Sequence, residues 1–303
     1  MLQSRSVHTP RPYLRIAAFA AVLGVVFAIS AIAGAALDPE VDEQSSEHGE
    51  EEKMDAHATA PTAETTAALP GLAVEQGGYR LVPDATTVAA SPAAAYTFRI
   101  VDADGDTVQD FEVEHERRMH LIIVRRDFAH FQHLHPEQRA DGSWVAAADL
   151  EAGGVYRAFA DFATNGESLT LATDLFVPGR FEPAPLPAPA LTADAGDGYR
   201  VALDGTEGES HLSFNVTRHG REIESVEPYL GADGHLVALR EHDQAFLHVH
   251  PQGEPGGSGP ISFAVSYPTP GNYRLFLQFK HDGMVRTAAF TQSVDEVGQH
   301  GGD

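Results

Sequence analysis

Short apolar segments separated by turn residues run through most of the chain after residue 70. Segments rich in Val, Ile, Phe and Tyr that alternate with other positions are typical of β-strands with one buried face. Residues 156–162 place an apolar side chain at every second position on one face, and residues 273–279 repeat this pattern. No segment of helical period and comparable strength follows residue 37. The pattern therefore predicts an all-β protein.

The longest apolar segment lies near the N-terminus, where residues 16–37 form a run of 22 without a charged side chain. About 20 apolar residues span a bilayer as a helix. The preceding residues 1–15 carry three Arg and no acid, which favours a cytoplasmic N-terminus. Small residues at Ala31, Ala33 and Ala35 also fit a signal-peptide cleavage site. We therefore expect a single-pass cell-membrane anchor with the C-terminal part extracytoplasmic, or a secreted protein whose leader is removed.

Two segments poor in large apolar residues divide the remainder of the chain. Residues 38–70 are first strongly acidic and then rich in Ala, Thr and Pro, so we expect a disordered stalk. Residues 181–196 include four prolines at alternate positions, which favour an extended linker. This organisation predicts one domain at 71–180, a second at 197–295 and a disordered tail at 296–303.

The two predicted domains resemble each other as copies of one unit. Five blocks of the first domain return in the same order in the second, 115 to 120 residues later. The pairs of blocks are 78–80 and 198–200, 96–98 and 212–214, 120–124 and 235–239, 131–136 and 246–251, and 154–159 and 271–276. With about seven short strands in each 100 residues, we expect two tandem β-sandwiches of immunoglobulin-like or cupredoxin-like type.

Each copy carries a histidine followed, after twelve residues, by the motif His-x-His-Pro. Residues i and i+2 of a strand share a face, and a hairpin with a four-residue loop would place the first histidine opposite the third. The spacing thus predicts three converging imidazoles in each copy, although a one-residue slip would move the first histidine to the other face. These residues are His120, His133 and His135 in the first copy and His235, His248 and His250 in the second.

Three imidazoles suit Cu(II), Zn(II) or Ni(II). The chain has 16 His, 4 Met and no Cys, so a site for a soft or borderline metal must depend mainly on imidazole. Met119 beside His120, and His281 with the nearby Met284, are weaker candidates for ligands. Two alternatives remain open at this point: a structural network of hydrogen-bonded histidines, and a site for a ligand other than a metal.

Composition narrows the function further. Acidic residues number 44 against 20 basic ones, for a formal charge of −24, which argues against a general nucleic-acid binder. No Ser-His-Asp order, carboxylate pair or phosphate-binding loop suggests catalysis, so we do not expect an enzyme. His115, His211 and His219 have no partner in the sequence and are expected on the surface.

Four motifs together resemble a known group of proteins. They are H-L-I-x-V, F-x-H-x-H-P, D-G-x-W and G-x-Y-R-x-F-x-D-F, all in the first copy. The group consists of uncharacterised exported or membrane-anchored proteins, mostly actinobacterial and linked to heavy-metal handling. The resemblance covers residues 78–180, with a degenerate copy at 198–294 that lacks a counterpart of Trp144. A more distant similarity to periplasmic β-sandwich proteins of the copper-resistance type implies their fold.

These observations predict an extracytoplasmic protein that binds a transition metal, copper first and zinc second, as a carrier or buffer in metal homeostasis. The expected partners are the metal ion and a membrane metal transporter. The alternative is a metal-free, membrane-tethered interaction module for a transporter or another envelope partner.

Overall fold

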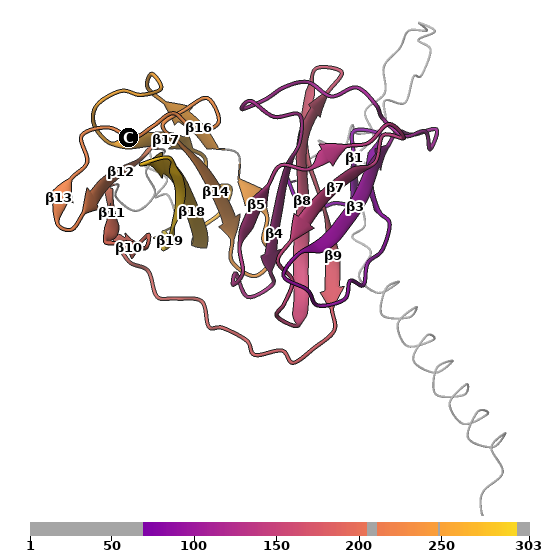
Figure 1. Ribbon diagram of the computed structural model, residues 1–303, viewed down its shortest axis with the longest axis horizontal. Helices are drawn as coiled ribbons and strands as arrows, with labels where there is room; N and C mark the ends of the chain where they lie inside the picture. The colour runs from indigo at the N-terminus through magenta and orange to yellow at the C-terminus, as the bar shows by residue number, and fades with distance from the viewer. Residues whose placement is uncertain (1–68, 205–210, 248, 296–303) are drawn as a thin grey trace, which may run out of the picture. The chain divides into compact units, whose positions relative to one another are not determined.

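The computed structural model describes residues 69–204, 211–247 and 249–295 (Figure 1). The predicted anchor at 16–37, nearly all of the predicted stalk and the tail at 296–303 lie outside these residues. In the described ranges, no helix has the length and apolar character needed to cross a bilayer. The described chain is all-β, with four antiparallel sheets that form two tandem β-sandwiches, as the sequence predicts.

Sandwich 1 consists of an outer sheet in the order β1-β2-β3-β7-β6 and an inner sheet in the order β5-β4-β8-β9 (Figure 1). Consecutive pairs such as β4–β5 and β8–β9 are antiparallel hairpins. The strands are β1 (Glu75–Gln76), β2 (Tyr79–Pro83), β3 (Ala94–Val101), β4 (His120–Arg125), β5 (Gln132–Leu134), β6 (Glu137–Gln138), β7 (Trp144–Ala148), β8 (Gly154–Thr164) and β9 (Glu167–Val177).

Sandwich 2 repeats this arrangement. Its outer sheet has the order β10-β11-β12-β17-β16, with β13 also paired to β12, and its inner sheet has the order β15-β14-β18-β19. The strands are β10 (Thr192–Asp194), β11 (Tyr199–Asp204), β12 (His211–Arg218), β13 (Arg221–Glu222), β14 (Gly234–Arg240), β15 (Phe246–Leu247), β16 (Val249–Gln252), β17 (Ile261–Val265), β18 (Gly271–His281) and β19 (Met284–Val294).

Each sandwich has its own hydrophobic core between its two sheets. In β8 the alternate residues Tyr156, Ala158, Ala160 and Phe162 all enter the core of sandwich 1, as their period of two predicts. The corresponding residues of β18 enter the core of sandwich 2 in the same way. The copied sequence pattern therefore produces the same layer twice.

A third hydrophobic core lies between the two inner sheets. It is formed by the positions that alternate with those of the sandwich cores, such as Ile122 and Val124 of β4 and Val237 and Leu239 of β14. Strands buried on both faces have nearly continuous apolar sequences. The apolar runs at 121–124 and 236–239 therefore reflect a second covered face.

The aromatic contacts of this third core are exchanged between the copies. The ring of Phe131 stacks on Phe276 with centroids 4.0 Å apart, while Phe246, the counterpart of Phe131, contacts Phe159 at 5.7 Å. Phe159 and Phe276 are themselves counterparts. The pair Phe131–Phe276 and the pair Phe246–Phe159 are thus the same contact with the two copies exchanged. Isologous interfaces of symmetric dimers have this pattern.

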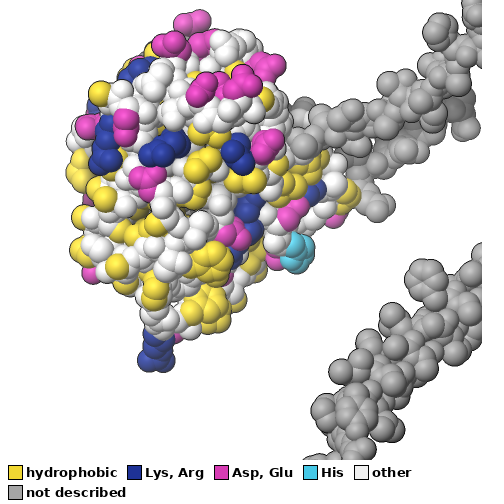
Figure 2. All heavy atoms as spheres, turned by 90° about the vertical axis from the view of Figure 1, so that its right-hand side faces the viewer, with side chains coloured by type: hydrophobic (Ala, Val, Ile, Leu, Met, Phe, Trp, Pro, Cys, Tyr) yellow, Lys and Arg dark blue, Asp and Glu magenta, His cyan; other side chains and the backbone are white. Residues whose placement is uncertain are grey.

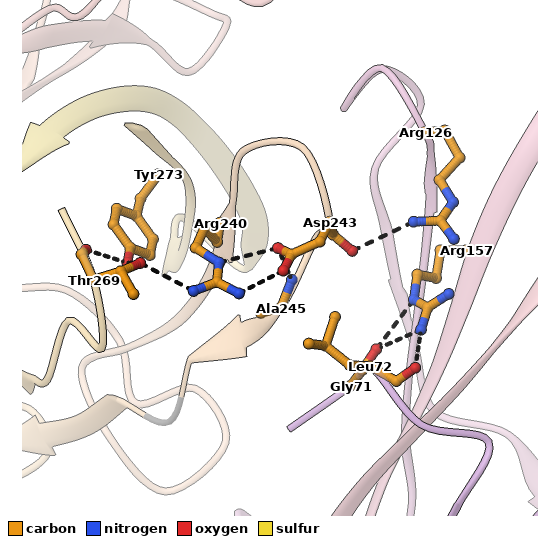
Figure 3. Close-up of polar contacts among 9 residues, drawn as sticks. All are labelled: Gly71, Leu72, Arg126, Arg157, Arg240, Asp243, Ala245, Thr269 and Tyr273. Carbon is orange, nitrogen blue, oxygen red and sulfur yellow. Dashed lines mark hydrogen bonds and ion pairs between the residues drawn. The ribbon is translucent and has the colours of Figure 1, made fainter. Parts of the chain in front are cut away.

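Polar contacts surround this core (Figure 3). The guanidinium group of Arg157 donates to the backbone carbonyls of Gly71 at 2.7 Å and Leu72 at 2.9 Å. Arg126 donates to the backbone carbonyl of Asp243 at 3.4 Å, and Asp243 also forms an ion pair with Arg240. Of these contacts, the one between Arg126 and Asp243 joins the two sandwiches, and the others lie within one of them.

One face of the surface carries intermixed charges. In Figure 2, basic and acidic side chains alternate with scattered apolar ones, and histidine is rare. No continuous basic stripe crosses this view, whereas a nucleic-acid-binding face would carry clustered Lys and Arg.

Candidate metal centre

Three histidines meet at one end of the interface between the inner sheets. His120 begins β4, His133 lies in β5, and His235 lies in β14. One ring nitrogen of each lies within 4.8 Å of those of the other two. The alternation that directs Ile122 and Val237 into the interface directs His120 and His235 there as well, two residues earlier on each strand.

In the first copy, the hairpin has the predicted register. Ile122 of β4 pairs with His133 of β5. Strand β5 ends at Leu134, so His135 lies just beyond the ladder. Its ring nevertheless packs 5.2 Å from that of His120 and 4.8 Å from that of His133. The three predicted imidazoles of this copy therefore do converge.

In the second copy, the predicted hairpin pairing of His235 with His250 is wrong, because His250 pairs with Ala264 of β17. Val249 already lies in the outer sheet, whereas its counterpart in the first copy, Leu134, still lies in β5 of the inner sheet. Val249 packs against the core of sandwich 2 as the chain joins β16 of the outer sheet. His250 is exposed on β16 and does not face His235. His248 lies outside the described residues.

His235 instead joins the cluster of the first copy. Its ring stacks on His120 with centroids 5.6 Å apart and lies 4.6 Å from His133. The candidate centre is therefore composite, with ligands from both sandwiches. Hairpin spacing does not reveal this arrangement, because it depends on the packing of one sandwich against the other.

Hydrogen bonds fix the orientation of two of these rings. His133 Nδ1 donates to Oε1 of Gln278, which lies on β18 of the opposite sandwich, at 2.7 Å. His120 Nε2 donates to the backbone carbonyl of Glu114 at 3.1 Å. The two remaining nitrogens, His120 Nδ1 and His133 Nε2, face each other at 3.0 Å.

In this hydrogen-bond pattern, neither His120 nor His133 has a proton on the nitrogen that faces the other ring. A neutral imidazole has one N–H, and in both rings the outer nitrogen uses it. The inner nitrogens then present facing lone pairs, which repel unless a proton or a metal cation lies between them. Two imidazole nitrogens bound to one ion at 2.0–2.1 Å are about 2.9–3.4 Å apart, so the observed 3.0 Å suits a metal ion.

Burial disfavours the proton. Desolvation, together with positive charge on the neighbouring His120 and His135, lowers the pKa of His133 to about 3. Desolvation also lowers the pKa of His135 to about 4 and holds the pKa of His235 well below 6.5. These imidazoles are therefore neutral near pH 7, which is the form that coordinates metals.

The surroundings match those of metal-binding histidines. Such rings usually donate their other N–H to a carbonyl or carboxylate, as His120 and His133 do here. The Nε2 atom of His135 is buried and has no hydrogen-bond partner among the described residues. It is thus a candidate fourth ligand. The cluster of His120, His133 and His235 could hold a metal ion.

A cavity of about 40 Å³ adjoins the cluster. His235, His115, Asp161 and Leu230 contribute to its lining. Asp161 pairs with His120 across β4 and β8, and its charge raises the pKa of His120 against the larger lowering by desolvation. His115 is exposed as predicted, and the centroid of its ring lies 5.8 Å from that of His235.

The weaker candidates lie elsewhere. Met119 is buried in the core of sandwich 1, because it precedes His120 and points to the opposite face. His281 shares a hydrogen bond of 2.8 Å with the hydroxyl of Tyr199. Met284 pairs with His281 at the end of the β18–β19 hairpin and is 56% exposed. The structure brings none of the three to the histidine cluster.

Fold and site together define a tandem β-sandwich protein with a histidine cluster between its two sandwiches. The chain belongs to the family described as "Domain of unknown function (DUF8832)", whose model matches residues 73–179 and 193–296, once in each sandwich. The duplication inferred from the sequence is thus confirmed. Among curated proteins, no relative matches.

Several solved structures are similar at low identity. They include the Escherichia coli adhesin FdeC (15% identity, TM-score 0.26, covering 74% of this chain and 66% of that one). InvD of Yersinia pseudotuberculosis has 11% identity, a TM-score of 0.24 and coverages of 73% and 58%. Invasin, a bacterial integrin-binding protein, has 12% identity, a TM-score of 0.21 and coverages of 74% and 41%. The chain thus spans less than two thirds of each of these proteins, and the likeness concerns the β-sandwich fold alone.

Proposed function

We propose that this chain is an extracytoplasmic metal-binding protein that holds one copper ion between its two sandwiches and acts as a carrier or buffer in metal homeostasis. The observation that supports this most directly is the pair of facing nitrogens of His120 and His133, 3.0 Å apart, whose outer nitrogens are both tied to acceptors. His235 supplies the third ligand, from the opposite sandwich.

The donor set favours copper over zinc. Sites made of nitrogen ligands bind divalent first-row metals in the order that places Cu(II) above both Ni(II) and Zn(II). All donors in the cluster are imidazoles, and the nearby Met119 points away into the core. Zinc is the second candidate, because four imidazoles with His135 included would suit its tetrahedral geometry.

The cellular setting of the proposal follows from the sequence. Residues 16–37 would anchor the protein in the membrane or direct its export, and a membrane metal transporter would be the partner that delivers or receives the ion. We assign the sandwiches to the immunoglobulin-like or cupredoxin-like type on strand number and spacing.

Metal titration of the full chain tests the proposal. We expect the unmodified protein to bind one equivalent of Cu(II) tightly, with weaker uptake by the acidic N-terminal region. His133→Ala and His235→Ala should each remove the tight site, measured by calorimetry and by the nitrogen couplings in the EPR spectrum. Zn(II) and Cu(I) titrations run in parallel establish the metal preference.

His250→Ala provides the matched control, because His250 belongs to the same sequence motif but is exposed on the outer sheet. This variant should bind like the unmodified protein. Equal copper uptake by the His133→Ala variant and the unmodified chain would contradict the proposal and favour a metal-free interaction module.

A further inference from the structure

The exposed imidazole of His115 is held over the cluster by a tight turn. Glu114 and Arg117 exchange two backbone hydrogen bonds of 2.9 Å, which makes His115 and Glu116 the central residues of a two-residue hairpin. Their φ angles are 47° and 63°. Such turns favour Gly, Asn or Asp at both positions, and neither residue here is one of these. The turn thus holds the ring of His115 beside the cluster.

The same turn is tied directly to the centre. The backbone carbonyl of Glu114 accepts the hydrogen bond from His120 Nε2. The ring of His115 lies 5.8 Å from that of His235 and 6.1 Å from that of His120, between centroids. His115 also lines the small cavity together with Asp161. One side of its ring thus contacts solvent, and the other faces the candidate ligands.

The corresponding turn of sandwich 2 has a different character. Tyr229 and Ala232 bracket it with the same pair of backbone hydrogen bonds, and Leu230 stands where sandwich 1 has His115. Leu230 is 3% exposed and lines the same cavity. The pseudo-symmetric positions beside the centre are therefore an exposed imidazole on one side and a buried aliphatic side chain on the other.

We infer that His115 is the access ligand of the metal centre. It captures the ion from solvent beside the carboxylate of Asp161 and passes it to the buried histidines. The transfer is a ligand exchange, in which a bond from the ion to His235 forms as the bond to His115 breaks, and no electron is gained or lost. This inference rests on the proposed copper binding and adds a route by which the ion arrives.

Copper-transfer kinetics on the full chain test this role. Asn tolerates the left-handed backbone region, so His115→Asn removes the imidazole while keeping the turn. His130→Asn is the matched control, because His130 is also exposed, also has a positive φ (54°) and lies at the tip of the β4–β5 hairpin. Cu(II) is supplied from a coloured chelator, and the rate of colour loss is followed by stopped-flow absorbance.

We expect His115→Asn to take up Cu(II) at least about 10-fold more slowly, with the equilibrium affinity changed by less than about 3-fold. His130→Asn should match the unmodified protein in both. Thermal unfolding of both variants, together with the more permissive His115→Gly, separates this effect from a failure to fold.

Three outcomes overturn the inference in distinguishable ways. If His115→Asn and His130→Asn load copper at the same rate while His133→Ala does not bind it, copper binding stands and the access role fails. If His115→Asn abolishes equilibrium binding, His115 is a permanent ligand rather than an access ligand. If the unmodified chain takes up no copper, the proposed function and the access role fail together.

Discussion

Gly71 shows how closely the two sandwiches approach each other. Its φ is 70°, and a Cβ added there would lie 2.8 Å from the ring of Phe159 and 2.9 Å from Cβ of Phe246. These two residues belong to different sandwiches. Because the backbone passes between them, only glycine fits without displacing one of them.

We therefore expect Gly71→Ala to lower the free energy of unfolding by about 1–3 kcal/mol more than a glycine substitution without such a clash. Gly105→Ala is the matched control, since Gly105 also has a positive φ (89°) but no atom within 4 Å of the added Cβ. Urea unfolding of both variants measures the difference. Equal losses of unfolding free energy in the two variants would show that Phe159 and Phe246 leave room for a Cβ at Gly71.

Protonation of the buried imidazoles gives a prediction for metal-free protein. The pKa of His133 is about 3 in the folded protein and near 6.5 when the chain is unfolded. Because the unfolded state then binds more protons, the free energy of unfolding falls as the pH drops below about 6.5. The loss continues until the pH reaches the pKa of His133 in the folded protein, about 3. At pH 5 this amounts to about 2 kcal/mol for His133.

Denaturant unfolding between pH 7.5 and pH 5 measures this slope. His133→Gln keeps a polar side chain of similar size but does not titrate, so its stability should depend less on pH. A variant whose pH profile parallels that of the unmodified protein would show that His133 is protonated equally in both states.

At the scale of elements, strand β4 illustrates what the sequence could predict. Period-two alternation and turn pairs were sufficient to predict the strands. The spacing of the histidines was sufficient to predict the register of the β4–β5 hairpin. The run at 121–124 is apolar at every position. Alternation alone therefore did not show which face of β4 packs inside sandwich 1 and which packs against sandwich 2. That information lies in the packing of two sheets far apart in sequence.

The second hairpin shows why the rest could not be predicted. Strand β15 has the expected register, but Val249 already lies in β16 of the outer sheet, whereas its counterpart Leu134 still lies in β5 of the inner sheet. Both hairpins carry the same motif, so the point at which the chain crosses to the other sheet is not set by the motif alone. The position of His250 therefore followed from tertiary packing rather than from local pattern.

The stacked pair Phe131 and Phe276 tests the third core. Phe276 is 2% exposed and belongs to the core between the inner sheets. We expect Phe276→Ala to lower the free energy of unfolding by about 3–5 kcal/mol, as for other buried aromatic residues. Phe176→Ala serves as the control, because Phe176 is 47% exposed and should cost less than half as much. Similar losses in calorimetric unfolding would contradict the packing of the inner sheets.

At the scale of the whole molecule, the composite centre links metal binding to the association of the sandwiches. An ion that binds only the associated state stabilises it by about 2.7 kcal/mol at a concentration 100-fold above its dissociation constant. We expect Cu(II) to raise the unfolding temperature of the unmodified chain and of His250→Ala, but not of His235→Ala. Sandwich 1 keeps all its own histidines in the latter variant. A full copper effect in His235→Ala would place the ion within sandwich 1 alone.

The Pro-rich connection between β9 and β10 has a separate consequence. The two sandwiches contact each other through an apolar core, aromatic pairs and hydrogen bonds. The connection contributes Leu186 to the packing of that core, and as a tether it also raises the effective concentration of one half around the other into the millimolar range. A chain cut within residues 178–191 would thus resemble a heterodimer, and an ion bound at the composite centre would bridge its halves. In that form, the supply of copper would govern whether the two halves remain together.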